Sequence, residues 1–120
     1  MKKSIELLKQ GFESSSSKTP EFINFAYTFK RELTKELKNA DCTLVKYNVG
    51  HFYVSGFFKT PSGELYYFSL GDVRGSDYVM QTENVYKMMY RTAMTTDDYT
   101  GGRNQWAEIE HDMIVNLNLI

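Results

Sequence analysis

The stretch that decides the fold is residues 51–71, HFYVSGFFKTPSGELYYFSLG. Two runs rich in aromatic and β-branched side chains flank the turn sequence TPSG at residues 60–63, which is typical of a β-hairpin. Pro61 fits the first corner of a type I turn, and Gly63 supplies the positive φ that closes such a turn with a bulge. We therefore predict two antiparallel strands, over His51–Lys59 and Glu64–Gly71.

The turn also predicts a register for this hairpin. With Lys59 opposite Glu64, unlike charges face each other at the mouth of the hairpin. The same register puts the Tyr67 ring over Gly56, which would shield the glycine backbone. Rings then occupy both faces of the hairpin. The predicted sets are Tyr53, Phe57, Tyr66 and Phe68 on one face, and Phe52, Phe58 and Tyr67 on the other.

Helices are predicted on the N-terminal side of the hairpin. Thr19 can cap the first amides of a helix that has Pro20 at its first position, and Asn39-Ala40-Asp41 closes it. Its apolar residues recur at spacings of three and four, which indicates one buried face: Phe22, Ala26, Phe29, Leu33 and Leu37. A shorter helix is predicted over Ser4–Phe12. Between the two, residues 13–18 form a short, flexible, serine-rich link.

The remaining segments complete an α+β domain. Strands are predicted over Thr43–Val49, Val85–Ala93 and Asn104–Ile109, with a helical turn as the alternative for Val85–Ala93. Residues 73–84 are predicted to form a loop, and Glu110–Ile120 a short C-terminal helix. The predicted fold class is α+β: two N-terminal helices, then a four- or five-stranded antiparallel sheet and a short C-terminal helix, in a single domain over residues 1–120.

Composition fits an ordinary soluble domain. The chain has 120 residues, of which 42% are hydrophobic and 24% charged, with a net charge of -1, which excludes a disordered chain and a polycation. No run approaches the ~18 apolar residues of a membrane span, and Glu6 and Lys9 interrupt any signal-peptide pattern. The single cysteine, Cys42, excludes an internal disulfide and fits a reducing compartment, so a cytoplasmic protein is expected.

Aromatic density is the first candidate functional feature. The chain has nine tyrosines, eight phenylalanines and one tryptophan. A sheet covered by helices on one side needs only one apolar face. Either a second layer covers the other face and all the rings are core, or one face stays partly open and binds a partner.

Charge distribution is the second feature. Residues 1–60 hold ten Lys/Arg and six Asp/Glu, whereas residues 61–120 hold four and nine. Cations form a stripe on the predicted long helix, which is either a solvated face or a docking face for a partner. The predicted partner-binding residues are Arg31, Lys35, Lys38, Tyr53, Tyr66 and Tyr67.

Groups that could carry chemistry are sparse. Carboxylates flank His111 in Glu108-Ile109-Glu110-His111-Asp112, but their spacing matches no metal-ligand pattern. His51 is expected to pair locally with Asp72. The Gly101-Gly102 loop beside Arg103 is either a plain connection or an anion cradle. No nucleophile elbow, P-loop, dinucleotide fingerprint or HExxH motif is present, so no catalytic residue, metal or cofactor is predicted.

Two segments carry a family resemblance. HFYVSGFF at residues 51–58, continuing to Asp72-Val73-Arg74, and MYRTA at residues 89–93, continuing to DYTGGRNQ at residues 98–105, are similar to small orphan accessory proteins of bacterial plasmids, integrative elements and prophages. Anti-CRISPR inhibitors are found among such proteins. The resemblance implies a non-enzymatic inhibitor that binds a host protein, with an RNA-guided Cas nuclease as the specific candidate.

Two other functions stay open at this point. One is a nucleic-acid-binding accessory factor of element transfer or replication, and the other is a small enzyme with a site built on His51 or His111. Inhibitors that mimic DNA are strongly acidic, whereas this chain is near neutral, so contact through aromatic side chains and a local charge patch is expected. The oligomeric state is not predicted.

Overall fold

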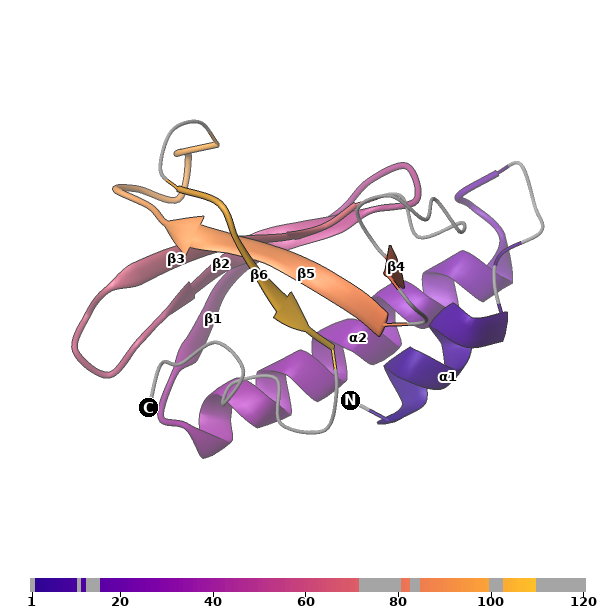
Figure 1. Cartoon of the computed structure of the whole chain (residues 1–120), viewed down its shortest axis with the longest axis horizontal. Helices are drawn as coiled ribbons and strands as arrows, with labels where there is room; N and C mark the ends of the chain where they lie inside the picture. The colour runs from indigo at the N-terminus through magenta and orange to yellow at the C-terminus, as the bar shows by residue number, and fades with distance from the viewer. Residues whose placement is uncertain are drawn as a thin grey trace.

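The structure of the protein is a computed structural model that describes residues 2–10, 12, 16–71, 81–82, 85–99 and 103–109. Two helices and six strands lie within these residues (Figure 1). In chain order they are α1 (Lys2–Gln10), α2 (Pro20–Asn39), β1 (Thr43–Val49), β2 (Val54–Lys59), β3 (Leu65–Leu70), β4 (Gln81–Thr82), β5 (Val85–Thr92) and β6 (Gln105–Glu108).

Five strands form an antiparallel sheet in the order β1-β2-β3-β5-β6, and the two-residue β4 pairs with β5 as well. Both helices lie on the same side of this sheet (Figure 1), which we call the helix face; the opposite side is the outer face. The α+β class and the predicted strands at Thr43–Val49 and Val85–Ala93 are confirmed. Gln81–Thr82 was predicted as loop but pairs as β4, and the predicted C-terminal helix lies outside the described residues.

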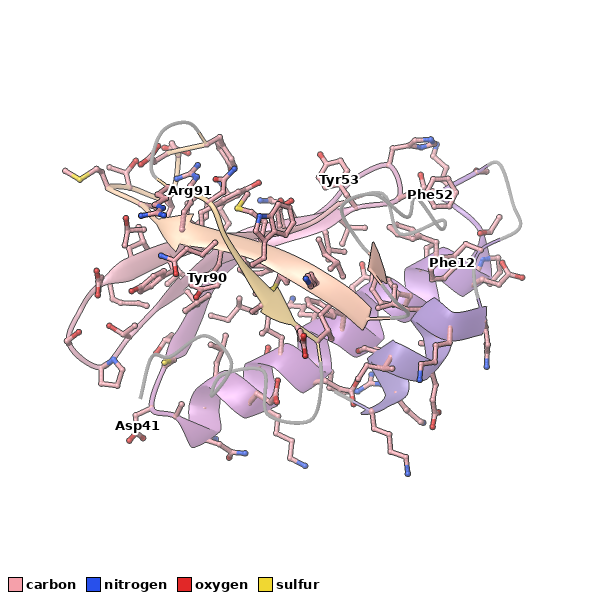
Figure 2. The ribbon with its side chains drawn as sticks, viewed as in Figure 1. Phe12, Asp41, Phe52, Tyr53, Tyr90 and Arg91 are labelled. Atoms are coloured by element: carbon pink, nitrogen blue, oxygen red, sulfur yellow. The ribbon has the colours of Figure 1, made fainter. Side chains whose placement is uncertain are left out.

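The long helix α2 begins and ends where its sequence predicts. Pro20 is its first residue, and Thr19 holds the N-cap position, but the Thr19 hydroxyl makes no capping hydrogen bond, contrary to the prediction. At the other end (Figure 2) Asp41 has a φ of 58°, the left-handed conformation that usually takes glycine. The Cys42 N–H donates to the Leu37 carbonyl at 2.8 Å and the Asp41 N–H to the Lys38 carbonyl at 3.0 Å, a Schellman motif.

The main core lies between α2 and the helix face. The predicted apolar stripe of α2 is buried there, together with Phe25, against side chains from β2, β3 and β5: Val54, Phe58, Phe68, Leu70 and Met88. Tyr47 of β1 is tied to the helix by its hydroxyl, which donates to the Ala26 carbonyl at 2.7 Å. Burial raises the pKa of the Tyr47 hydroxyl, so this donor keeps its proton.

The β2–β3 hairpin is present, but its predicted register is wrong by one residue. Lys59 lies opposite Leu65 instead of Glu64, and Phe58 lies opposite Tyr66. The bulge explains the shift. The Gly63 N–H donates to the Thr60 carbonyl and the Thr60 N–H to the Glu64 carbonyl, both at 2.9 Å, so the loop has three residues instead of four. Gly63 has the expected positive φ, 89°.

This shift redistributes the rings between the two faces, because a one-residue slip turns over every side chain of one strand relative to the other. Phe57 and Tyr67 lie on the outer face, whereas Phe58, Tyr66 and Phe68 lie on the helix face. The predicted Tyr67–Gly56 contact is also wrong. Gly56 pairs with Phe68, whose ring closes over it.

The start of β2 also differs from the prediction, because residues 51–53 form the turn after β1. The Gly50 N–H donates to the Tyr53 carbonyl at 2.9 Å across this turn. Phe52 takes a φ of 59° and is fully buried, with its ring 5.2 Å from that of Phe22. The left-handed backbone at Phe52 reverses the chain and sends the ring into the core.

Candidate interaction surfaces

A row of four side chains crosses the outer face of the sheet. Lys46, Phe57, Tyr67 and Arg91 are consecutive cross-strand partners on β1, β2, β3 and β5. The two rings stand in the middle with centroids 5.2 Å apart, and a cation stands at each end. We call these four residues the outer-face row.

Residues 94–99 fold back over this row and cover its rings. The Tyr99 ring meets Phe57 and Tyr67 edge-on, with centroid distances of 5.6 and 5.7 Å. Phe57 is therefore fully buried although it faces away from both helices. The outer face thus has a small aromatic core of its own, separate from the main core.

The two cations of the row hold the 94–99 loop from its two sides. Lys46 donates to the Tyr99 hydroxyl at 3.0 Å and to the Thr96 carbonyl at 3.4 Å. Its ammonium also lies 3.6 Å from the Asp97 carboxylate, and the bond to Tyr99, with these charges, raises the pKa of Lys46. Lys46 keeps its positive charge at neutral pH and so keeps its hold on the loop.

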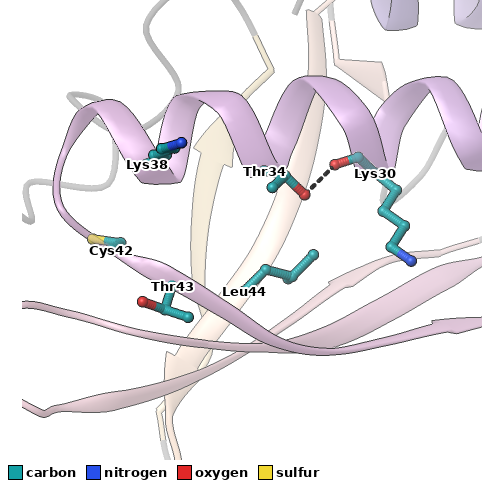
Figure 3. Close-up of a pocket in the computed structure, with 6 residues that line it drawn as sticks. All are labelled: Lys30, Thr34, Lys38, Cys42, Thr43 and Leu44. Carbon is teal, nitrogen blue, oxygen red and sulfur yellow. Dashed lines mark hydrogen bonds between the residues drawn. The ribbon is translucent and has the colours of Figure 1, made fainter.

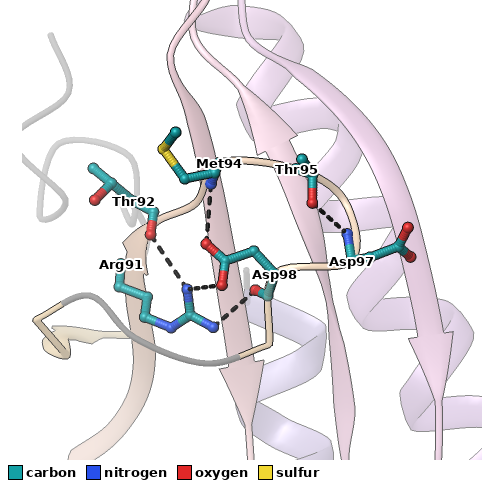
Figure 4. Close-up of polar contacts among 6 residues, drawn as sticks. All are labelled: Arg91, Thr92, Met94, Thr95, Asp97 and Asp98. Carbon is teal, nitrogen blue, oxygen red and sulfur yellow. Dashed lines mark hydrogen bonds and ion pairs between the residues drawn. The ribbon is translucent and has the colours of Figure 1, made fainter.

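Arg91 holds the other side of the loop (Figure 4). The residue is only 2% exposed, and one guanidinium nitrogen donates to the Asp98 carbonyl at 2.9 Å. The other donates to the Thr92 carbonyl at 3.3 Å and lies 3.9 Å from the Asp98 carboxylate. The guanidinium also stacks 4.7 Å from the Tyr67 ring centroid. Planar stacking and forked donors are properties that arginine has and lysine lacks.

The three tyrosines predicted to bind a partner do not share one surface. Tyr53 is 43% exposed and lies on the outer side of the sheet, as Arg91 does (Figure 2). Tyr67 is half-buried in the outer-face row. Tyr66 is half-buried on the helix face, stacked on Phe58 at 5.4 Å, and burial raises the pKa of its hydroxyl.

Sequence reasoning missed Tyr27 on α2, which is 57% exposed, and two exposed rings on the sheet side of the molecule. Tyr99 and Trp106 are each 48% exposed, Tyr99 on the 94–99 loop and Trp106 on β6 opposite Met89. Trp106 was predicted to lie in a strand, but the prediction did not say which face of that strand is covered, so the exposure of Trp106 was not predicted. The alternation within β6, where Ala107 is buried and both its neighbours are exposed, carries that information.

The three predicted cations lie together on α2, on the solvent side of the helix. Arg31, Lys35 and Lys38 are exposed, and within the described residues no hydrogen bond or ion pair engages their side chains. Their neighbour Glu32 points to α1 instead. It accepts hydrogen bonds from the Ser4 hydroxyl at 2.6 Å, the Ser4 N–H at 2.7 Å and the Lys3 N–H at 3.3 Å. Carboxylate and cations on α2 are thus segregated.

A groove separates α2 from β1, and no prediction pointed to it. Its volume is about 410 Å³, and Figure 3 shows three helix residues facing the first residues of the strand across it. The residues that line this α2–β1 groove are Lys30, Thr34, Lys38, Cys42, Thr43 and Leu44. Burial, reinforced by Asp41, raises the pKa of the Cys42 thiol, which stays protonated at neutral pH.

The candidate chemical groups lie only in part within the described residues. His51 is exposed, and its Nδ1 lies 3.1 Å from the Ser17 hydroxyl. Its expected partner Asp72 lies outside the described residues, as do His111 and the Gly101-Gly102 loop. Among the residues that are described, no three His, Cys, Asp or Glu side chains are placed to hold a metal ion. Within the same residues, neither helix has the length and apolar character that crossing a membrane requires.

Comparison with known proteins found no relative of this chain. The chain matches no protein-family model, no curated protein and no solved structure. The function has therefore to be inferred from the residues themselves.

Proposed function

We propose that this protein acts by binding a host protein and performs no chemistry of its own. The resemblance to accessory proteins of mobile elements makes an RNA-guided Cas nuclease the specific candidate partner. In this proposal the protein is an anti-CRISPR inhibitor that blocks the nuclease through a local charge patch, since a net charge of -1 does not suit bulk mimicry of DNA.

The observation that carries the proposal is the cationic face of α2. Arg31, Lys35 and Lys38 occupy one side of a helix whose opposite side is fixed in the main core. Cations three and four residues apart weaken an isolated helix slightly, and Lys38 in the last turn complements the helix dipole, so the net local benefit of the cluster is small. Glu32, one of the carboxylates beside these cations, is engaged by α1. An uncompensated patch on a rigid element attracts and orients an acidic surface.

Pull-down with a panel of Cas nucleases, followed by a DNA-cleavage assay, tests the proposal. We expect at least one nuclease to be retained and inhibited. Charge reversal of the patch (Arg31→Glu, Lys35→Glu, Lys38→Glu) should weaken binding by ~100-fold or more, because each lost contact pair costs about a factor of ten when partly desolvated.

The matched control reverses three exposed lysines elsewhere: Lys9→Glu, Lys18→Glu and Lys59→Glu. This variant has the same net charge as the patch variant. If both variants lose binding equally, the charge of the whole protein and not the α2 patch is responsible. If no nuclease binds the wild-type protein, the proposed partner class is wrong.

The same patch favours a second candidate function, binding of nucleic acid by an accessory factor. Lys30 extends the three cations along α2, and lysines and arginines on one helix are the usual contacts to phosphates. This function predicts a gel shift whose affinity falls steeply with salt and weakens in Lys35→Ala. An absent shift, or one insensitive to salt, removes it.

A further inference from the structure

The structure points to a second docking site, along the edge of β1 that adjoins α2. We propose that an extended acidic segment of a partner protein binds there as an added β-strand, with its side chains in the α2–β1 groove. This inference rests on the proposed function, because it specifies how a protein partner is held. It shares Lys38 with the cationic patch but does not involve Arg31 or Lys35.

The first support is the free edge of the sheet. β1 is the terminal strand of the order β1-β2-β3-β5-β6, so only one of its two edges is paired within the described residues. A bulge between Leu44 and Lys46 disturbs the start of β1, whereas Lys46 to Val49 pair with β2 in an unbroken register. Alternate backbone N–H and C=O groups of such a regular edge point outward, where another strand can bond to them.

The second support is the charge of the groove, which lies beside the start of the same strand at Thr43 and Leu44. Lys30 and Lys38 stand at its two ends on α2, with Thr34 between them, and no carboxylate lines it. The Thr34 hydroxyl donates its hydrogen to the Lys30 carbonyl at 2.6 Å (Figure 3), so it does not offer this hydrogen to a ligand. The charged donors of the groove are the ammonium groups of Lys30 and Lys38. Asp41 lies beyond its end, next to Cys42. Acidic side chains are therefore the ones that this groove complements.

The third support is the apolar surface that continues the groove. Three of the exposed large hydrophobic side chains in the described part of the chain stand on the two elements that form it: Ile23 and Tyr27 on α2 and Val49 on β1, each between 40% and 57% exposed. Ile23 and Tyr27 lie on the same side of α2 as Lys30, at spacings of four and three. A segment that alternates acidic and apolar residues would match both parts of the surface.

A backbone edge also discriminates between partner classes. Strand addition needs peptide N–H and C=O groups in the ligand, which nucleic acids lack. Phosphates could still bind Lys30 and Lys38, but they would leave the edge of β1 unpaired.

The experiment is a titration of the isotope-labelled full chain, followed by NMR, with a synthetic ten-residue peptide of alternating valine and glutamate. We expect the amides of β1 to shift and to gain protection from hydrogen exchange. The same peptide with alternate amides N-methylated keeps its side chains but cannot add as a strand, so it should bind at least about tenfold more weakly.

Two charge-reversal variants locate the site. Lys30→Glu with Lys38→Glu should weaken binding of the peptide about tenfold, whereas Arg31→Glu with Lys35→Glu, the same change in charge at α2 residues that do not line the groove, should leave the affinity within about twofold. Equal binding of the N-methylated peptide, shifts confined to Arg31 and Lys35, or no shift in β1 at millimolar peptide would each overturn the inference. A single-stranded oligonucleotide that protects β1 equally would overturn it as well. None of these results bears on whether a nuclease is retained in the pull-down.

Discussion

The two faces of the sheet are buried by different means. The helix face is covered by a twenty-residue helix through phenylalanine and leucine side chains, with few polar groups between the layers. The outer face is covered, over Phe57 and Tyr67, by the short 94–99 loop that Lys46 and Arg91 hold in place. One cover relies on apolar area and the other on hydrogen bonds from cations, so they should respond differently to mutation, pH and salt.

The largest effect should come from removing a ring of the main core. Phe29→Ala deletes a fully buried side chain of α2 and should lower the free energy of unfolding by about 3–5 kcal/mol, the usual cost of a lost aromatic and its cavity. Urea denaturation measures it. Tyr27→Ala, on the exposed side of the same helix, is the control and should cost less than about 1 kcal/mol. Similar losses for both variants would show that α2 is not held by its apolar stripe.

Replacement of Arg91 should destabilise the cover of the outer face. Arg91→Lys keeps the charge but cannot donate to both the Asp98 and the Thr92 carbonyls, so buried acceptors lose partners. We expect a loss of about 1–3 kcal/mol and faster hydrogen exchange in residues 94–99, with little change in α2. Arg103→Lys, at an exposed arginine, should change neither. Uniformly faster exchange over the whole chain would mean that the two covers unfold as one unit.

Acid should act on the helix side through Glu32. Burial by itself raises the pKa of this carboxyl, but its hydrogen bonds from Ser4 and Lys3 outweigh burial, and the net pKa is lowered. The stabilisation is therefore present above the unfolded pKa of about 4.3 and is lost as the pH falls through the lower folded value.

Glu32→Gln removes the negative charge that Glu32, on α2, places against the first turn of α1. It should lower the free energy of unfolding by about 1 kcal/mol at pH 7 and flatten the loss of stability between about pH 5 and pH 3. Thermal unfolding over this pH range checks it, with Glu6→Gln on α1 as the control. Parallel pH profiles for the wild type and Glu32→Gln would contradict the assignment.

The smallest effect should be a gain. Asp41 holds a left-handed conformation at the end of α2, where its carboxylate also meets the negative end of the helix dipole. Asp41→Gly should stabilise the protein by about 0.5–1 kcal/mol without altering exchange in residues 94–99. Asn39→Gly, two residues earlier in the helix, should destabilise it by a similar amount. A loss on Asp41→Gly would show that its side chain has a partner.

Much of the helix side could be predicted from the sequence, because its signals are local. The spacing from Phe22 to Leu37, with Pro20 before it, is contained in twenty consecutive residues and gives both ends of α2. The hairpin could also be predicted, but not its register. The register depends on whether Thr60 pairs with Glu64 as the last residue of the ladder or is itself part of the loop. In the structure it pairs, and the Thr60 hydroxyl supports this pair by accepting the Glu64 N–H at 3.1 Å.

The outer side could not be predicted, because its parts are distant in the chain. Lys46, Phe57, Tyr67 and Arg91 come from four strands, and a register wrong by one residue had placed Phe57 and Tyr67 on opposite faces. The 94–99 loop has no periodic pattern that would indicate which surface it covers. The α2–β1 groove was missed for a related reason, since it exists only where α2 and β1 lie side by side.

The three-residue loop between β2 and β3 limits how this chain can change over time. Point replacements at Pro61 or Ser62 leave the pairing of Thr60 with Glu64 intact, so such changes can accumulate there. Gain or loss of one amino acid would instead turn one of the two strands over relative to the other, so that either Phe58 leaves the core in exchange for Phe57 or Phe68 leaves it in exchange for Tyr67. Insertions and deletions in the β2–β3 loop should therefore be tolerated only in even numbers of residues, whereas substitutions at Pro61 and Ser62 should be tolerated freely.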